Sequence, residues 1–379
     1  MSAASRVLCV SELLGMILTL LPPAVVAAVG QTCHTARKGV SSYTKTAFNV
    51  DTVLSLFFND PRAFRSLLAK TGSVVSGSAA LQAAARVRYP GSDLDVYVYC
   101  EALANVVQFM TAAGYEYHPY HHQPESLAEA MLPENWDGSY YHSAPHVPGI
   151  GTVINLKKVV GGVERSVQLI VSTEDSCPGE LILCFHSRTW STLLHDLGWP
   201  CMLKQLLAAL VMNVITYNAL YCPYPRTVFS EERTVVCNTT GIHGTDGAAL
   251  DKYRQRGWNV VRPAELDVDG RRSVEESFHV GIVRSFTDRY SWVVPQDMTG
   301  VTLPDARTPM TTERTHDPIE CASWKMVLGA SAAGMRYQVV SSANLEHRYV
   351  MYRELEMRSE WISDVERDIN CGKDSEERR

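Results

Sequence analysis

The segments Val74-Val75-Ser76-Gly77-Ser78 and Ser92-Asp93-Leu94-Asp95-Val96-Tyr97-Val98 carry the strongest structural signal in this chain of 379 residues. The first joins a short apolar run to a Gly-Ser turn, and the second alternates two carboxylates with apolar residues. Because successive side chains of a strand point to opposite faces, Asp93 and Asp95 share one face. Two such carboxylates repel each other unless a cation lies between them, and Mg²⁺ prefers oxygen ligands and also binds substrate phosphates. The pair therefore predicts a metal site for phosphoryl or nucleotidyl transfer.

The surrounding residues show the patterns of a mixed α+β protein, because strands and helices alternate around these two segments. Gly161-Gly162 separates two strand-like runs and suits a two-residue β-hairpin turn. In chain order, the patterns predict strand Val74–Val75, helix Ala79–Arg86, strand Leu94–Cys100, helix Glu101–Ala113, hairpin strands Thr152–Val160 and Val163–Ser172, strand Leu181–His186, helix Met202–Tyr221, helix Ala248–Arg256, and paired strands Phe278–Phe286 and Tyr290–Val294.

Composition and charge limit the class of protein. Hydrophobic residues make up 46% of the chain and charged residues 20%, which is typical of a globular protein. The formal charge of -6 gives no overall reason to expect nucleic acid as a partner, although a local basic patch stays open. The ten cysteines are scattered without a C-x-x-C pair, which favours reduced thiols in an intracellular protein, cytoplasmic or nuclear.

An apolar segment, Leu13–Val29, raises the question of a membrane anchor or signal peptide. Glu12 precedes the segment, Pro22-Pro23 divides it, and each part is short for a membrane span. We therefore expect a buried helix pair and no membrane association.

The order Gly77-Ser78, helix, Asp93-Leu94-Asp95 resembles the nucleotidyltransferase fold of polymerase β-like enzymes, poly(A) polymerases and antibiotic nucleotidyltransferases, over about residues 50–260. More narrowly, the chain is similar to fungal proteins that join an F-box-like segment to such a domain, through runs such as Gln168-Leu169-Ile170 and Lys252-Tyr253-x-x-Arg256-Gly257-Trp258. The resemblance implies that Gly77 and Ser78 contact nucleotide phosphates through backbone N–H groups and a hydroxyl. It also implies that Asp93 and Asp95 are the catalytic carboxylates and hold Mg²⁺.

In the enzymes of this fold, a third carboxylate on an adjacent strand completes the site. The residue of this chain that aligns best with it is Gln168, on the expected strand Val163–Ser172. An amide is a weaker metal ligand than a carboxylate and is no general base, so Gln168 is a substrate-binding candidate only. Glu164 lies on the same face about 13 Å along the strand, too far to replace the missing carboxylate.

The first residues of the chain carry a second resemblance. An apolar start, Glu12-Leu13-Leu14, Ile17-Leu18, Leu21-Pro22-Pro23 and a Val-rich helix ending near Cys33 resemble an F-box. The resemblance implies that residues 1–50 bind a ubiquitin-ligase adaptor. The usual motif has a charged residue after its proline and this chain does not, so a helical hairpin that simply packs on the rest of the protein is the alternative.

These observations leave two functions from different classes. The first is a Mg²⁺-dependent, nucleotide-binding transferase-like protein that uses an NTP as substrate or ligand. The second is an F-box-type adaptor whose inactive transferase domain binds a partner. A poorly maintained paralogue without activity is a third. The predicted organisation is an F-box-like helical segment at 1–50, a nucleotidyltransferase-like domain at 51–260, a small β-containing region at 261–352 and a charged, partly disordered tail at 353–379. Residues 188–209 are an insertion or retained intron, or else an ordinary N-terminal extension of the following helix.

Overall fold

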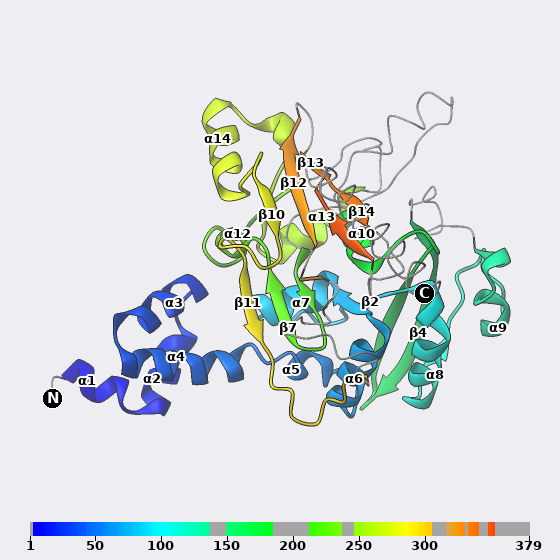
Figure 1. Ribbon diagram of the computed structural model, residues 1–379, viewed down its shortest axis with the longest axis horizontal. Coiled ribbons are helices and arrows are strands. Elements are labelled where there is room, and N and C mark those ends of the chain that lie inside the picture. The colour runs from blue at the N-terminus through cyan, green and yellow to red at the C-terminus, as the bar shows by residue number, and fades with distance from the viewer. Residues whose placement is uncertain are drawn as a thin grey trace, which may run out of the picture.

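The computed structural model describes residues 3–136, 149–184, 212–236, 246–304, 317, 319–320, 322–329, 333–340 and 348–352. In this part of the chain, helices surround a mixed sheet whose eight strands run in the order β11-β7-β6-β1-β2-β5-β4-β3 (Figure 1). The predicted mixed α/β class is confirmed. No helix among these residues is both long and apolar enough to cross a membrane.

The large sheet is antiparallel at every junction except one, because β2 and β5 run parallel. The predicted hairpin around Gly161-Gly162 is confirmed, and its two strands pair along their full length. The strands of this sheet are β1 (Val74–Ser76), β2 (Leu94–Val98), β3 (Glu116–Tyr117), β4 (Ile150–Val160), β5 (Val163–Ser172), β6 (Val214–Ile215), β7 (Ala219–Cys222) and β11 (Trp292–Pro295).

Alternation along β2 separates the core from the candidate site. Leu94, Val96 and Val98 are fully buried on one face, whereas Asp95 lies on the other face and is half-buried. Helix α7 (Gly77–Ala85) contacts β1, β2, β6 and β7. Its small Ala, Gly and Ser side chains allow this close packing, and every residue from the helix start through position 84 is buried.

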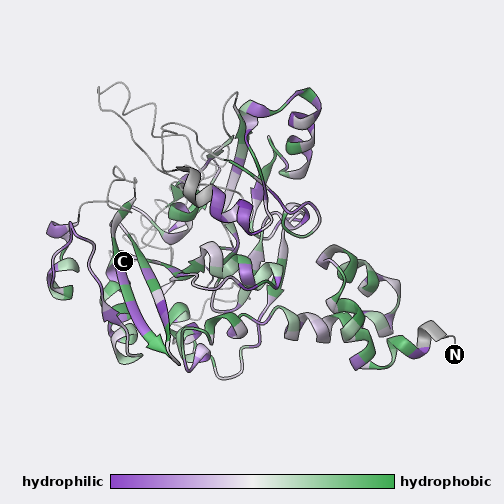
Figure 2. Ribbon diagram, turned by 180° about the vertical axis from the view of Figure 1, so that it is seen from behind, coloured by the Kyte–Doolittle hydropathy of each residue, from purple (hydrophilic) through white to green (hydrophobic). Residues whose placement is uncertain are grey.

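The N-terminal helices form a lobe beside the sheet, and long α4 leads from the lobe toward α5 (Figure 1). Leu14, Leu18 and Val26 form its small core, and hydrophobic residues run along its helices (Figure 2). Pro22 precedes α3 with a φ of -60° and a non-helical ψ of 147°, and Pro23 occupies its first turn, where a missing N–H is tolerated. The predicted pair of helices is present, but the expectation that the pair is buried is wrong, because Leu13, Met16 and Leu20 are exposed. The helices of the lobe are α1 (Ala3–Leu8), α2 (Ser11–Thr19), α3 (Pro23–Thr32) and α4 (His34–Ala47).

Arg86 joins the lobe to the end of α7. It adopts a left-handed φ of 56° and donates from Nη2 to the Leu21 carbonyl oxygen at 2.9 Å and from Nη1 to the Tyr43 hydroxyl. Its guanidinium also lies 5.2 Å from the centre of the Phe48 ring. The helix that begins at Gly77 therefore ends on the lobe.

The remaining described elements cover the sheet or form small sheets of their own. The further helices are α5 (Asp51–Leu54), α6 (Pro61–Thr71), α8 (Leu103–Ala112), α9 (Leu127–Ala130), α10 (Pro178–Cys184), α12 (Pro225–Phe229), α13 (Asp246–Gln255) and α14 (Val268–Ser277). The small sheets comprise β10 (Val283–Ser285), β12 (Ser323–Leu328) and β13 (Ala333–Arg336), the parallel pair β8 (Arg233–Val235) and β9 (Asn259–Val261), and the pair β14 (Gln338–Val340) and β15 (Tyr349–Met351).

Three expectations about secondary structure are wrong. The described part of the expected strand Leu181–His186 belongs to helix α10, and the described end of the expected helix Met202–Tyr221 forms strands β6 and β7. Short apolar runs do not distinguish a buried strand from a buried helix, because neither shows a periodic polar face. The expected pairing of Phe278–Phe286 with Tyr290–Val294 is also wrong, because β10 pairs with β12 and β11 pairs with β7.

The domain boundaries stay predictions. Strand β11 lies within the region 261–352 yet forms the edge of the large sheet, which belongs mainly to the preceding region. The predicted insertion at 188–209 and the predicted tail at 353–379 lie outside the described residues.

Candidate functional site

A row of polar side chains crosses the large sheet on the face opposite the core residues of β2. Strand register places Ser76 beside Asp95, Asp95 beside Gln168, and Gln168 beside Asn155, on β1, β2, β5 and β4. Residues directly opposite each other in neighbouring strands share one face of a sheet. The structure therefore places Gln168 next to Asp95. This is the neighbouring-strand position at which the enzymes that the chain resembles carry a third carboxylate.

Gly77 brings backbone directly against the Asp95 carboxylate. Its φ of +67° is in the left-handed region, and a Cβ added there would lie 2.1 Å from Asp95 Oδ2. A side chain at this position therefore requires both a rare backbone conformation and displacement of the carboxylate. Gly77 and Ser78 also begin α7, whose first N–H groups have no partner within the helix. Such N–H groups suit an anion that sits beside the carboxylates.

Asp93 precedes β2 and Asp95 lies within it, and both are half-buried. Burial and then the negative charge of Asp93 raise the pKa of Asp95, the ammonium of Lys252 lowers it, and the net result is a pKa of about 7. A cation between the carboxylates would favour ionisation of both. Carboxylate oxygens are ligands that Mg²⁺ prefers, together with substrate phosphates and water, so the two carboxylates fit this metal. Within the described ranges, no cluster of three or more His, Cys, Asp or Glu residues is placed to hold a metal.

The position of the third carboxylate holds a neutral pair. Gln168 is only 6% exposed, and its Nε2 donates to the Tyr120 hydroxyl at 3.3 Å. Burial, with the negative charges of Asp93 and Asp95, raises the pKa of Tyr120 to about 12, so this phenol stays protonated at neutral pH. Glu164 does not reach the site, because its carboxylate accepts from Lys157 Nζ at 2.8 Å toward the hairpin tip.

Two cations that the sequence analysis did not assign to the site, Lys252 on α13 and Arg256 in the turn after it, lie near the Asp93–Asp95 segment. Lys252 acts electrostatically on Asp95, as its effect on the pKa shows. Arg256 donates from Nη2 to Ser92 Oγ at 3.2 Å, immediately before Asp93 in the sequence, and lies 4.1 Å from the centre of the Tyr89 ring. The spacing of four residues between Lys252 and Arg256 was the available signal, because such residues share one helix face.

Other basic residues of this region, Lys158, Arg86, Arg88, Lys157 and Arg165, could be phosphate contacts or ordinary surface charges. Lys158 Nζ donates to the Ala113 carbonyl oxygen at 2.9 Å, and Arg88 Nη2 donates to that of Thr52 at 3.2 Å. Arg86 holds the lobe, as described above. These three cations are therefore engaged with neighbouring backbone or hydroxyl oxygens, whereas Lys252 acts electrostatically on Asp95.

Comparisons of the chain with models of known protein families, with curated proteins and with solved structures return no match.

Proposed function

We propose that the chain is a nucleotidyltransferase-like protein that binds a Mg²⁺-nucleotide through Gly77, Ser78, Asp93 and Asp95. The observation that carries this proposal is the contact between the Gly77 backbone and the Asp95 carboxylate at the start of a buried helix. It brings an anion-binding helix end and a cation-binding carboxylate pair together. A nucleoside triphosphate with its bound metal carries a negative phosphate tail beside a cation, and these two groups complement the helix end and the carboxylate pair.

Each residue has a separate role in the proposed complex. The first N–H groups of α7 and the Ser78 hydroxyl bind phosphate oxygens, and Asp93 and Asp95 hold the metal. We assign neutralisation of the phosphate tail to Lys252 and Arg256, because Lys252 acts electrostatically on Asp95 and the buried Arg256 Nη1 has no hydrogen-bond partner among the described residues. When bound, Mg²⁺ supplies charge stabilisation at the phosphates.

Transfer chemistry has weaker support than binding. The acceptor hydroxyl needs a group that removes its proton, and the neighbouring position holds the neutral pair Gln168 and Tyr120. Neither the amide nor a phenol with a pKa raised to about 12 is a base at neutral pH. The proposed function is therefore nucleotide binding, with transfer to an acceptor as a separate question for experiment.

Isothermal titration of Mg²⁺-ATP and Mg²⁺-GTP tests the proposal. We expect saturable binding to the full chain and at least about tenfold weaker binding to Asp93→Asn/Asp95→Asn, which corresponds to about 1.4 kcal/mol. Glu164→Gln is the control, because it removes a carboxylate from the same sheet far from the site. Absent binding, or equal binding to the double variant, would contradict the proposal. Incorporation of labelled nucleotide in a cell extract then separates an enzyme from a binding protein.

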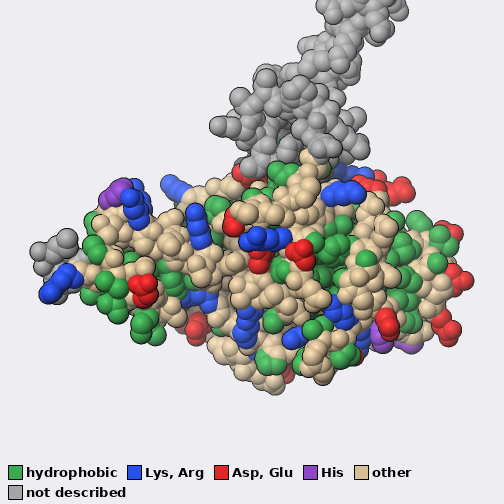
Figure 3. All heavy atoms as spheres, turned by 90° about the horizontal axis from the view of Figure 1, so that it is seen from below, with side chains coloured by type: hydrophobic (Ala, Val, Ile, Leu, Met, Phe, Trp, Pro, Cys, Tyr) green, Lys and Arg blue, Asp and Glu red, His purple; other side chains and the backbone are tan. Residues whose placement is uncertain are grey.

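A second function, that of an adaptor for a ubiquitin ligase, is favoured by the surface of α2. Leu14 and Leu18 face the lobe core, whereas Leu13, Met16 and Leu20 are 47%, 68% and 84% exposed on and just after the same helix. This exposed stripe also includes Val10 and Ile17, and hydrophobic side chains are visible on the lobe at the left end of Figure 3. Exposed apolar stripes of this kind mark protein interaction sites.

A pull-down of the ubiquitin-ligase adaptor by the full chain tests this second function. We expect Leu13→Asp/Leu20→Asp to abolish capture, because it places two charges on the apolar stripe. Ser42→Asp adds a charge to an exposed position of α4 and serves as the control. If neither the wild type nor the control captures the adaptor, the second function is wrong.

A further inference from the structure

A buried glutamine links the start of α7 to the segment that leads into strand β2. Gln82 lies on the second turn of α7 and is only 3% exposed. Its amide must use both its donor and its acceptor, because an unpaired polar group is costly away from water. The Nε2 atom donates to the Ser78 carbonyl oxygen at 3.2 Å, and Oε1 accepts from the Tyr89 N–H at 2.8 Å. One side chain therefore joins the helix start to the segment before the carboxylates.

The bond to Ser78 acts on a peptide group of the proposed phosphate site. The Ser78 carbonyl oxygen belongs to the same planar peptide unit as the Ala79 N–H, and the two groups point in opposite directions. This N–H is among the first of α7, which have no partner within the helix and can bind an anion. A donor on the carbonyl oxygen therefore fixes the direction of the N–H and strengthens it as a donor.

The bond to Tyr89 acts on the segment between α7 and β2. The Gln82 carbonyl oxygen also accepts from the Val87 N–H at 3.2 Å, so the backbone and the side chain of one residue hold this segment. The Tyr89 carbonyl oxygen then accepts from the Ser92 N–H at 3.3 Å, directly before Asp93 in the sequence. A short series of hydrogen bonds thus runs from the helix start to the first carboxylate.

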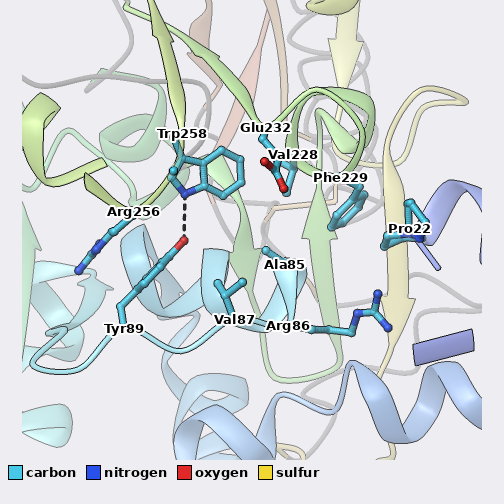
Figure 4. A pocket seen from close by; sticks show the side chains of 12 residues that line it. Pro22, Ala85, Arg86, Val87, Tyr89, Val228, Phe229, Glu232, Arg256 and Trp258 are labelled. Atoms are coloured by element: carbon cyan, nitrogen blue, oxygen red, sulfur yellow. Dashed lines mark hydrogen bonds between the residues drawn. The ribbon is translucent and has the colours of Figure 1, made fainter. Parts of the chain in front are cut away.

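The turn after α13 holds Tyr89 from another direction. Its hydroxyl accepts from Trp258 Nε1 at 2.9 Å, and this bond is the dashed line in Figure 4. The centre of the Tyr89 ring lies 4.1 Å from the Arg256 guanidinium, whose Nη2 donates to Ser92 Oγ at 3.2 Å. These contacts restrain Tyr89 beside Gln82, so the segment before β2 is a fixed support for the carboxylates.

We propose that Gln82 is a positioning residue that sets the spacing between the phosphate-binding helix start and the metal-binding carboxylates. The inference rests on the proposed nucleotide site and adds to it a residue that acts through Ser78 and Tyr89. A nucleotide with its metal contacts both ends at once, so without this bridge binding carries the entropy cost of ordering the segment. Replacing a residue that orients metal ligands typically changes affinity by about 10–100-fold.

Isothermal titration of Mg²⁺-ATP and Mg²⁺-GTP against Gln82→Met tests this proposal. Methionine keeps the length of the side chain and removes both hydrogen-bonding groups. We expect the Kd of the folded variant to rise about tenfold for the nucleotide that wild type binds. Thr227→Val is the matched control, because it removes a hydroxyl that is 1% exposed and donates to the Tyr224 carbonyl oxygen, a bond local to α12. We expect this control to lower stability without changing the Kd.

Gln82→Glu gives a readout that a purely structural role would not move. A protonated carboxyl group has one donor and one acceptor, as the amide does, whereas the carboxylate cannot donate to Ser78. Burial favours the protonated form. The ratio of the Kd of Gln82→Glu to that of wild type should therefore fall as the pH is lowered from about 8 to about 5. The ratio refers to folded protein, so a loss of stability alone leaves it unchanged.

The outcomes distinguish the role of Gln82 from nucleotide binding itself. If wild type binds nucleotide and Gln82→Met binds it with the same Kd, or if Thr227→Val weakens binding equally, only the role of Gln82 is wrong. A ratio for Gln82→Glu that does not change with pH also overturns this role, and this variant decides the question if Gln82→Met does not fold. Absent binding to wild type contradicts both proposals.

Discussion

The close approach of Gly77 to Asp95 makes the replacement Gly77→Ala the most informative single change in this protein. A Cβ at this position meets Asp95 Oδ2 at 2.1 Å, and the backbone has a φ of +67°. The chain contains a matched control, because Gly91 has a φ of +68° and an added Cβ there meets no atom within 4 Å. The two variants share the backbone strain, and only one of them also has the steric clash.

The magnitudes follow from these two contributions. Left-handed backbone disfavours alanine by about 1–2 kcal/mol, reduced slightly because alanine also restricts the unfolded chain, so Gly91→Ala is expected to lower the free energy of unfolding by about 1 kcal/mol. Gly77→Ala adds the displacement of a packed side chain, which costs about 1–3 kcal/mol. We therefore expect a total loss of about 2–4 kcal/mol for Gly77→Ala.

Urea unfolding at a pH of about 5 measures these differences while Asp95, with its pKa raised to about 7, is mainly protonated. A double-mutant cycle with Asp95→Ala isolates the clash, because removing the carboxyl group removes the atom that the new Cβ meets. We expect a coupling energy of about 1–3 kcal/mol. Equal losses for Gly77→Ala and Gly91→Ala, together with coupling near zero, would refute the proposed contact and the site geometry built on it.

Three further predictions concern single side chains. Because burial and Asp93 raise the pKa of Asp95 to about 7, the folded state holds this proton more tightly than the unfolded state does. Metal-free wild type should therefore lose about 2–3 kcal/mol of stability relative to Asp95→Asn as the pH rises from about 5 to about 8. A difference between the two proteins in urea unfolding that does not change with pH would count against this prediction. Gln168→Asp should tighten Mg²⁺ binding about tenfold by isothermal titration because it restores a carboxylate beside Asp95, and unchanged affinity would show that this position does not reach the metal. Arg86→Met should lower the free energy of unfolding by about 1–3 kcal/mol, measured by urea unfolding, because the carbonyl oxygen of Leu21 loses its charged donor; Arg88→Met is the control, and equal losses would be evidence against a specific role of Arg86 in holding the lobe.

Local sequence patterns predicted the structure correctly wherever strand periodicity determines the face on which a side chain lies. Alternation along Leu94–Val98 separates the buried aliphatic residues from Asp95, and the register of β5 places Gln168 beside that carboxylate, as the sequence predicts. The hairpin at Gly161-Gly162 follows from its turn residues in the same way. These features depend on neighbours in the chain or in one sheet.

Local patterns were insufficient where distant segments meet. Lys252 on α13 acts on Asp95, and Arg256 in the turn after α13 bonds to Ser92 next to Asp93. Both are far along the chain from β2, and no sequence periodicity predicts which sheet edge a helix end approaches. The run Leu181–Leu183 is uniformly buried, so its sequence suits a strand as well as a helix, and packing of α10 against β2 and β5 selects the helix.

The amino-acid order alone therefore establishes a Gly-Ser turn, a carboxylate pair on one strand face and a neutral residue at the neighbouring position. Folding in three dimensions determines that the Gly77 backbone touches Asp95, that Tyr120 pairs with Gln168, and that Arg86 bonds to the lobe. The physical reason is the distance along the chain between the residues that must interact. Side-chain direction along a strand is set by covalent geometry, whereas contacts between separate elements depend on the packing of the whole core.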